Sequence, residues 1–184
     1  DRSFKELVLS WAIKTQDTKL LFEVDPKCEY ISKRLKENPD RDFCLCCADA
    51  MGKGKLETNV HFKQIMNNDG GFDKILAYEK EEAKKFNNPN YHYFSDILYK
   101  HVVCKDNKDS MNILFKLDPQ YIKYYIVSAS KGDASKIFNA AQNNSKVDIL
   151  KNVLKEIQTN NTKLNENLRT KPTVKELYEK LRIN

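Results

Sequence analysis

The sequence LLFEVDP at residues 20–26 recurs as ILFKLDP at residues 113–119. Each heptapeptide closes a short apolar segment, and its Asp-Pro pair opens the next one. The distance along the sequence between the two copies changes by three residues over the match, and the hydrophilic stretch 105–109 can accommodate this insertion. Self-similarity of this kind predicts a repeat architecture with two pseudo-repeated halves. The match continues upstream of both heptapeptides, where Phe4, Leu7, Val8, Trp11 and Ala12 recur in spacing as Phe94, Ile97, Leu98, His101 and Val102.

Apolar residues along the chain follow the helical period of 3.6 residues, and no segment alternates convincingly. We therefore predict an all-α fold of tandem short antiparallel helix pairs, an irregular α-solenoid with about twelve helices. A compact helical bundle is the alternative. Residues 1–184 are expected to form a single all-α domain, with pseudo-repeat halves at 1–86 and 91–184 and a linker at 87–90. The polar stretch 158–171 is predicted to be disordered.

Local signals predict where several helices begin. Ser3 and Glu6 have the spacing of a capping box, in which each side chain satisfies a backbone amide of the other residue. In the first heptapeptide, Asp25 suits an N-cap and Pro26 suits the first helical position, where its missing N–H costs nothing. The residues from Phe4 to Ala12 form one apolar stripe, which is the pattern of an amphipathic helix.

Two segments share a more particular pattern, LSWAIKTQDTKLLFEVDP at residues 9–26 and AAQNNSKVDILKNVLKE at residues 140–156. In both, small residues in a first helix precede a polar turn and a Leu-Leu or Val-Leu pair in a second helix. The pattern resembles ankyrin-type repeats, over about half of the chain including looser copies at 99–119 and 46–66. The family's Thr-Pro-Leu-His opening is absent, so the chain looks like a degenerate ankyrin-like array. The resemblance implies an extended surface for binding another protein, without catalytic residues.

The net charge of +6 is concentrated toward the C-terminus, because residues 146–184 contain nine Lys or Arg and five Asp or Glu. A basic end of this kind can bind nucleic acid or an acidic partner. The charges interleave with apolar positions at helical spacing, which favours a solvated helical face. The longest uncharged apolar runs are far too short to cross a membrane.

Five cysteines are an odd number, and Cys44, Cys46 and Cys47 lie in one segment. This arrangement does not suit a disulfide scaffold and indicates reduced thiols in the cytoplasm. Because Asn, Lys, Ile and Tyr are abundant, as in AT-rich genomes, delivery of a microbial protein into a host cytosol is the alternative location. No metal-ligand spacing, nucleophile motif or phosphate-binding loop accompanies these cysteines. We therefore predict no catalytic residue, no metal and no cofactor.

The aromatic residues supply the candidate interaction site. Tyr91, His92 and Tyr93 form the densest aromatic run, and Tyr124 is the tyrosine of its helix that is expected outside the core. Exposed aromatic side chains are enriched in protein-interaction hot spots and also stack on single-stranded bases. Burial between the two halves explains the run at 91–93 equally well.

Three functional hypotheses follow from these observations. The favoured one is a non-catalytic protein–protein interaction module, such as a microbial protein that binds a host partner. The alternative is a nucleic-acid-binding helical domain that uses the basic C-terminal helices. A helical enzyme without a sequence signature is the third. The oligomeric state is left open by all three.

Overall fold

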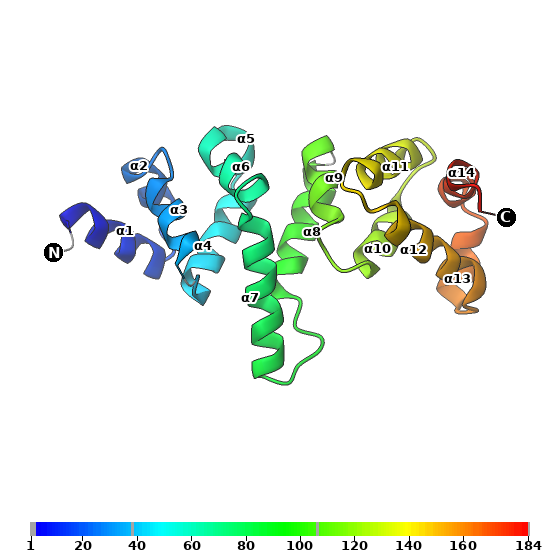
Figure 1. The fold of residues 1–184 in the computed structure, drawn as a ribbon, viewed down its shortest axis with the longest axis horizontal. Coiled ribbons are helices and arrows are strands. Elements are labelled where there is room, and N and C mark those ends of the chain that lie inside the picture. The colour runs from blue at the N-terminus through cyan, green and yellow to red at the C-terminus, as the bar shows by residue number, and fades with distance from the viewer. Residues whose placement is uncertain (1–2, 38, 106, 184) are drawn as a thin grey trace. The chain divides into compact units, whose positions relative to one another are not determined.

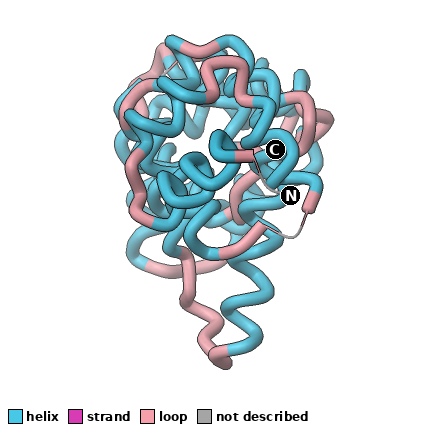
Figure 2. The backbone as a smooth tube through the Cα atoms, turned by 90° about the vertical axis from the view of Figure 1, so that its left-hand side faces the viewer, coloured by secondary structure: helices cyan, strands magenta, loops and turns pink. Residues whose placement is uncertain are grey.

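A computed structural model describes residues 3–37, 39–105 and 107–183. Asp106, which belongs to the hydrophilic stretch 105–109, lies outside these ranges. The described residues form fourteen α-helices and no strand, so the predicted all-α class is confirmed (Figures 1 and 2). The helix count exceeds the expected twelve for two reasons. One helix, expected over about 55–66, is divided into α5 (Lys55–Thr58) and α6 (Val60–Asn67), and α13 (Lys163–Arg169) forms in the stretch that was expected to be disordered. The arrangement as a tandem repeat stays a prediction.

The chain divides into two compact units, of which the first ends at Leu98 and the second begins at Tyr99. This boundary falls within helix α8, and the predicted halves and linker stay predictions. Unit 1 contains α1 Phe4–Lys14, α2 Thr18–Val24, α3 Glu29–Lys36, α4 Arg41–Gly52, α5 Lys55–Thr58, α6 Val60–Asn67, α7 Gly71–Lys85 and the start of α8 Tyr93–Lys105. Unit 2 contains the rest of α8, α9 Lys108–Leu114, α10 Gln120–Ser128, α11 Asp133–Asn143, α12 Val147–Thr159, α13 Lys163–Arg169 and α14 Pro172–Leu181.

The core of unit 1 is organised around α4, which packs against α1, α2 and α5. Seven of its twelve residues are buried, including three cysteines and two alanines. A helix that is apolar almost all round has to be surrounded by other helices. Its small side chains allow these neighbours to approach closely, which explains the concentration of cysteine and alanine in this helix.

The buried face of α1 differs from its apolar stripe. Leu9, Ala12 and Ile13 are buried, where α2 and α4 pack against this helix. Phe4 and Trp11 are 82% and 57% exposed. The stripe recognised in the sequence is therefore mostly a solvent-facing side, because α2 and α4 cover a neighbouring side of the helix.

Unit 2 is organised around α11, which packs against α9, α12 and α14. Its buried residues are Ala134, Ile137, Ala140 and Ala141, so that small side chains again lie where neighbouring helices meet. Close approach of helices requires such residues at the contact.

The predicted disorder at 158–171 is wrong. Helix α13 occupies half of this segment, and Asn165 and Leu168 are buried. The Nε group of Arg169 donates a hydrogen bond of 2.6 Å to the carbonyl of Ile157. The polar side chains of this segment thus satisfy backbone groups inside the unit, which composition alone does not show.

The two Asp-Pro pairs begin their helices differently. Helix α3 begins at Glu29, and its N-cap position is occupied by Cys28 in the left-handed conformation, so the predicted start at Pro26 is wrong. The carboxylate of Asp25 nevertheless accepts hydrogen bonds from the amides of Glu29, Tyr30 and Ile31. Asp25 therefore caps the helix from farther upstream than the usual N-cap position.

In the second copy, the helix start agrees closely with the prediction. Pro119 occupies the N-cap position of α10, directly before Gln120, and Asp118 accepts a hydrogen bond from the Gln120 amide at 3.1 Å.

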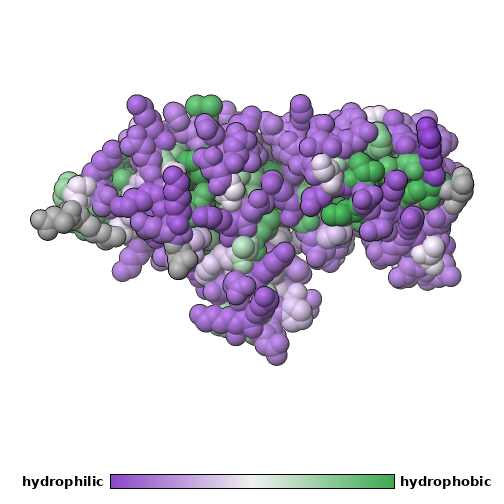
Figure 3. Space-filling model, in the orientation of Figure 1, coloured by the Kyte–Doolittle hydropathy of each residue, from purple (hydrophilic) through white to green (hydrophobic). Residues whose placement is uncertain are grey.

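Hydrophilic side chains predominate on the face drawn in Figure 3. No described helix combines the length and apolarity that a membrane crossing requires. The compartment in which the chain acts stays a prediction.

Candidate functional site

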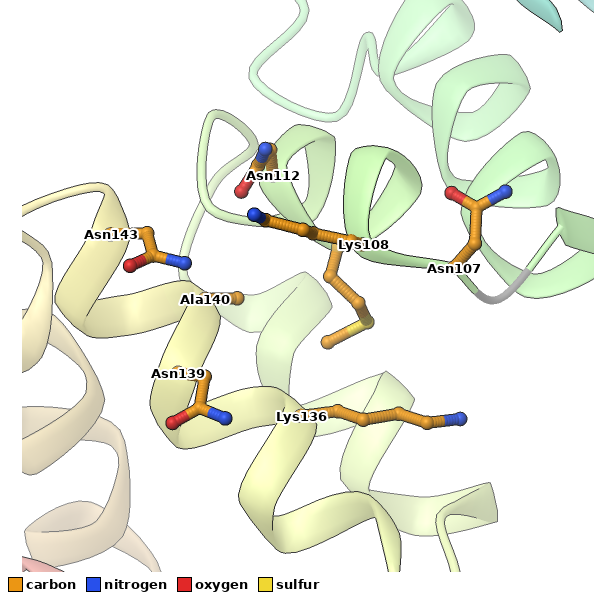
Figure 4. Close-up of a pocket in the computed structure, with 8 residues that line it drawn as sticks. Asn107, Lys108, Asn112, Lys136, Asn139, Ala140 and Asn143 are labelled. Atoms are coloured by element: carbon orange, nitrogen blue, oxygen red, sulfur yellow. The ribbon is translucent and has the colours of Figure 1, made fainter.

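A groove with a volume of about 400 Å³ lies between α9 and α11 within unit 2 (Figure 4). This volume falls within the usual range of ligand pockets. We call it the Asn–Lys groove, because amide and ammonium side chains make up most of its lining. The lining consists of Asn107, Lys108, Met111, Asn112, Lys136, Asn139, Ala140 and Asn143.

One wall of the groove is a face of α11. Lys136, Asn139 and Asn143 are separated by three and four residues, so they lie one above another on successive turns (Figure 4). Helix α11 is held in place from its other side, where Ala134, Ile137 and Ala141 are buried in unit 2. The helix thus presents a polar row to the groove while its apolar side anchors it.

The other wall is formed by α9, with Lys108 and Asn112 one turn apart. The start of this helix is fixed by a capping box, in which Asn107 accepts from the amide of Ser110 and Ser110 accepts from the amide of Asn107. The side chain of Met111 is buried between the walls and contributes apolar surface to the groove.

The two walls are joined by the side chain of Asn144, which follows the last residue of α11. Its Nδ2 group donates to Asn112 Oδ1 at 2.9 Å and to the carbonyl of Ala140 at 2.8 Å. This bridge orients the Asn112 amide and links α9 to α11 near the C-terminal end of α11. A preorganised wall of this kind loses less conformational entropy when a ligand binds.

The electrostatic character of the groove is positive. None of the described residues that line it is acidic, whereas Lys108 and Lys136 are both exposed. Lys136 Nζ lies 3.5 Å from Asp133 Oδ1, one turn earlier on the same helix. Asp133 also accepts hydrogen bonds from the amide and hydroxyl of Ser130.

The pKa of Asp133 results from opposing effects. Partial burial alone would raise the pKa of this carboxyl group, but the hydrogen bonds from Ser130 and the charge of Lys136 together lower it below its ordinary value. Asp133 therefore stays ionised at neutral pH and holds Lys136 at the edge of the groove.

The amides of Asn139 and Asn143 are available to a ligand. Neither side chain is bonded to another residue in the described part of the chain, and both are exposed. An asparagine amide offers both donor and acceptor groups, which is the complement of a peptide group. The lining residues named above include no histidine, thiol or hydroxyl group, and their ionisable groups are the amines of Lys108 and Lys136.

The residues predicted as an interaction site lie elsewhere. Tyr91 and His92 are partly buried in the segment between α7 and α8, and Tyr93 begins α8 with its ring 5.3 Å from that of Phe94. Tyr124 is exposed on α10, as expected, with its ring 5.7 Å from that of Tyr121. The first three residues belong to unit 1 and Tyr124 belongs to unit 2, and a role for any of them in binding stays a prediction.

The cysteines are mostly buried. Cys28, Cys44, Cys46 and Cys47 lie in the core of unit 1, and Cys104 is exposed. Burial, followed by the charge of a neighbouring aspartate, raises the pKa of the Cys28, Cys44 and Cys46 thiols to about 12. Burial also raises the pKa of the Cys47 thiol. These four groups are therefore neutral thiols at physiological pH, which are poor nucleophiles.

A second cavity, of about 330 Å³, lies beside Cys28 between α3 and α6. Cys28 and His61 both line it, together with Glu29 and Asp69. Because the Cys28 thiol is buried and donates to Asn59 Oδ1 at 3.7 Å, this pair of residue types does not make an activated thiolate. The described residues contain no group of three or more potential ligands that is suited to a metal ion.

The Asn–Lys groove was missed at the sequence level. A weak signal exists in the spacing of Lys136, Asn139 and Asn143, which places three polar groups on one side of an amphipathic helix. Polar rows on helices are usually solvated surface, so the row alone has little significance. Only the packing of α9 against α11 turns it into the wall of a groove.

No family model, curated protein or solved structure matches this chain. The resemblance to ankyrin-type repeats therefore stays a prediction. The function has to be argued from the groove and its surroundings.

Proposed function

We propose that this protein is a non-catalytic protein–protein interaction module and that the Asn–Lys groove binds a segment of its partner. The observation that carries this proposal is the pair of unbonded amides, Asn139 and Asn143, beside two lysines in a groove whose walls are already fixed. Such groups recognise peptide groups and carboxylates, which any protein partner supplies.

The composition of the groove favours protein over nucleic acid. Single-stranded nucleic acids are usually held by aromatic side chains on which bases stack, and none of the lining residues is aromatic. A peptide needs hydrogen-bonding groups at regular spacing and a small apolar contact. Met111 and Ala140 provide that contact.

Several C-terminal cations are engaged within unit 2, which also weakens the nucleic-acid hypothesis. Arg169 donates to the carbonyls of Ile157 and Asn160. Lys171 donates to the carbonyl of Val127, and Lys180 lies over the ring of Phe138. Cations held in this way are less available for phosphate groups.

The free cysteines are compatible with a protein that acts in the cytoplasm. Reduced thiols persist in a cytosolic environment, and four buried free cysteines are compatible with such a compartment. Cytoplasmic action, in the cell of origin or after delivery into a host cell, is the location that we propose.

The proposal is tested by affinity capture from a eukaryotic cell lysate, with quantitative mass spectrometry of the bound proteins. The wild-type chain is compared with the double variant Lys108→Glu/Lys136→Glu, with and without nuclease treatment. The matched control is Lys151→Glu/Lys155→Glu, which makes the same charge change on α12, outside the groove. Circular dichroism of all three proteins establishes that they fold alike.

We expect a protein that is captured by the wild type and by the control, survives nuclease, and is lost with the groove variant. Capture that is equal for all three chains would show that the groove is not the binding site. Recovery of RNA or DNA, lost after nuclease treatment, would replace the proposal with the nucleic-acid alternative.

A further inference from the structure

We infer that the occupant of the Asn–Lys groove is an extended, acidic peptide segment whose backbone is bound by Asn139 and Asn143. This inference rests on the proposed function and specifies the ligand of the same groove. It follows from three features of the lining: the spacing of the amides, the charge, and the apolar floor.

The spacing of the two asparagines matches an extended peptide. Residues four apart on a helix are separated by a rise of about 6 Å. Alternate residues of an extended strand are separated by about 6.6 Å, and their N–H and C=O groups point to the same side. Asn139 and Asn143 can therefore each bind one peptide unit of an extended segment that runs parallel to α11. A helical ligand offers such groups only at its ends, because the backbone groups in between are bonded within the helix.

The length of the polar row sets the length of the segment. From Lys136 to Asn143 the axis of α11 rises by about 10 Å. An extended chain covers this distance with about three residues. The recognised motif is therefore short, and its flanking residues extend beyond the row.

The charge of the groove specifies acidic side chains. Lys108 comes from α9 and Lys136 from α11, so the two ammonium groups belong to opposite walls. Lys108 has no ion-pair partner within the described residues, whereas Lys136 pairs with Asp133. A carboxylate of the ligand thus gains more from Lys108 than from Lys136. Complementary charge also accelerates association and excludes basic segments.

The floor of the groove specifies the side chain between the carboxylates. Met111 and Ala140 are buried and supply a narrow apolar surface. In an extended segment, neighbouring side chains point in opposite directions. One small or unbranched apolar side chain can then face the floor, and the acidic residues on either side of it project toward the lysines. Methionine is flexible enough to adapt to different apolar side chains.

The test is a selection from a random linear peptide library displayed on phage, with the full chain as the immobilised target. Selected sequences are synthesised with a fluorescent label, and their Kd values are measured by fluorescence polarisation. The variants are Asn139→Ala, Asn143→Ala and the double charge reversal Lys108→Glu/Lys136→Glu. The matched control is Asn152→Ala, an exposed asparagine on α12 outside the groove.

Selected peptides are expected to contain two or more Asp or Glu residues within a short segment. Each asparagine variant should bind them about tenfold more weakly, because each loses hydrogen bonds to the peptide backbone. The control should bind them as the wild type does. Methylation of one backbone nitrogen within the motif should abolish binding, since it removes a donor while the side chains remain.

Other outcomes contradict the inference. Selected peptides without carboxylates, or peptides that bind the two asparagine variants as tightly as the wild type, would overturn it. If the partner captured from lysate depends on the groove but no linear fragment of it binds, the inference fails while the proposed function stands. If neither the partner nor any selected peptide depends on the groove, both fail.

Discussion

The heptapeptides LLFEVDP and ILFKLDP share four of their seven residues but have different surroundings. Asp25 of the first is 3% exposed and accepts hydrogen bonds from three amides of α3. Asp118 of the second is exposed and accepts one from α10. The buried aspartate should contribute more to stability, because amides that lose their acceptor in the core cannot form hydrogen bonds with water instead.

The helices upstream of the heptapeptides differ in the same way. Phe4 of α1 is 82% exposed, whereas its counterpart Phe94 in α8 is 1% exposed. Phe94 packs against Tyr78 of α7, with ring centroids 5.9 Å apart, and Glu79 of the same helix accepts a hydrogen bond from the Ser95 amide at 2.8 Å. Helix α7 thus covers the start of α8. The comparison shows that a pattern of apolar residues identifies a helix, while its neighbours decide which side is buried.

The difference in burial between the two phenylalanines predicts the largest effect of a substitution on the free energy of unfolding. Phe94→Ala should lower the free energy of unfolding by about 3–5 kcal/mol, because it removes a fully buried ring and leaves a cavity. Phe4→Ala should change this free energy by less than about 0.5 kcal/mol. Urea denaturation followed by circular dichroism measures both values. A large loss with Phe4→Ala would mean that a buried contact of this ring exists in solution.

The difference between the two aspartates predicts an intermediate effect on the free energy of unfolding. Asp25→Ala should destabilise the protein by about 3 kcal/mol, since it removes a helix cap and leaves buried amides unbonded. Asp118→Ala should cost about 1 kcal/mol or less. Asp25→Asn, which retains one acceptor oxygen, should fall between these values. Equal losses for the two alanine variants would contradict the difference between the copies.

The distribution of thiols between the units predicts an effect on stability that is smallest at neutral pH and grows only above about pH 9. Burial raises the pKa of the Cys28, Cys44 and Cys46 thiols to about 12, so they stabilise the folded state fully below about pH 9 and progressively less as the pH rises toward 12. Burial raises the pKa of the Cys47 thiol as well. Each should contribute a loss on the order of 1 kcal/mol per pH unit in this window, because the unfolded chain releases its proton first.

The variants Cys44→Ala and Cys104→Ala separate this effect from the titration of other groups. Denaturation midpoints are measured at several pH values above 8, and the slope against pH is compared with that of the wild type. Cys44→Ala should reduce the slope, and Cys104→Ala, which removes an exposed thiol, is the control for a cysteine substitution outside the core. An unchanged slope for Cys44→Ala would show that this thiol is ionised at lower pH than its burial implies.

Much of the fold was predictable from local pattern. The helical period of the apolar residues predicted the all-α class. One half of the predicted capping box is formed, in which Ser3 Oγ accepts from the Glu6 amide. Polar composition predicts disorder at 158–171, which is wrong because polar side chains in this segment bond to the backbone. Asn165 donates to the carbonyl of Asn160, and Arg169 donates to the carbonyl of Ile157.

The candidate site was not predictable in the same way. Asn139 and Asn143 stand out in the sequence only as polar residues on a helix, and Lys108 lies about thirty residues earlier in another helix. The Asn144 bridge to Asn112, which sets the groove, joins residues 32 positions apart. Contacts between residues so far apart along the chain produce no periodic pattern in a single sequence.

The sequence by itself determined that this chain is helical and roughly where its helices lie, because periodicity and capping act within a few residues of each other. It also determined the pairs of matching segments. Only the tertiary structure decided that Phe94 is buried and Phe4 is not, that Asp25 caps α3 from a buried position, and that α9 and α11 enclose a polar groove. These properties depend on which helix packs beside which, and that choice depends on long-range contacts whose energies no local pattern specifies.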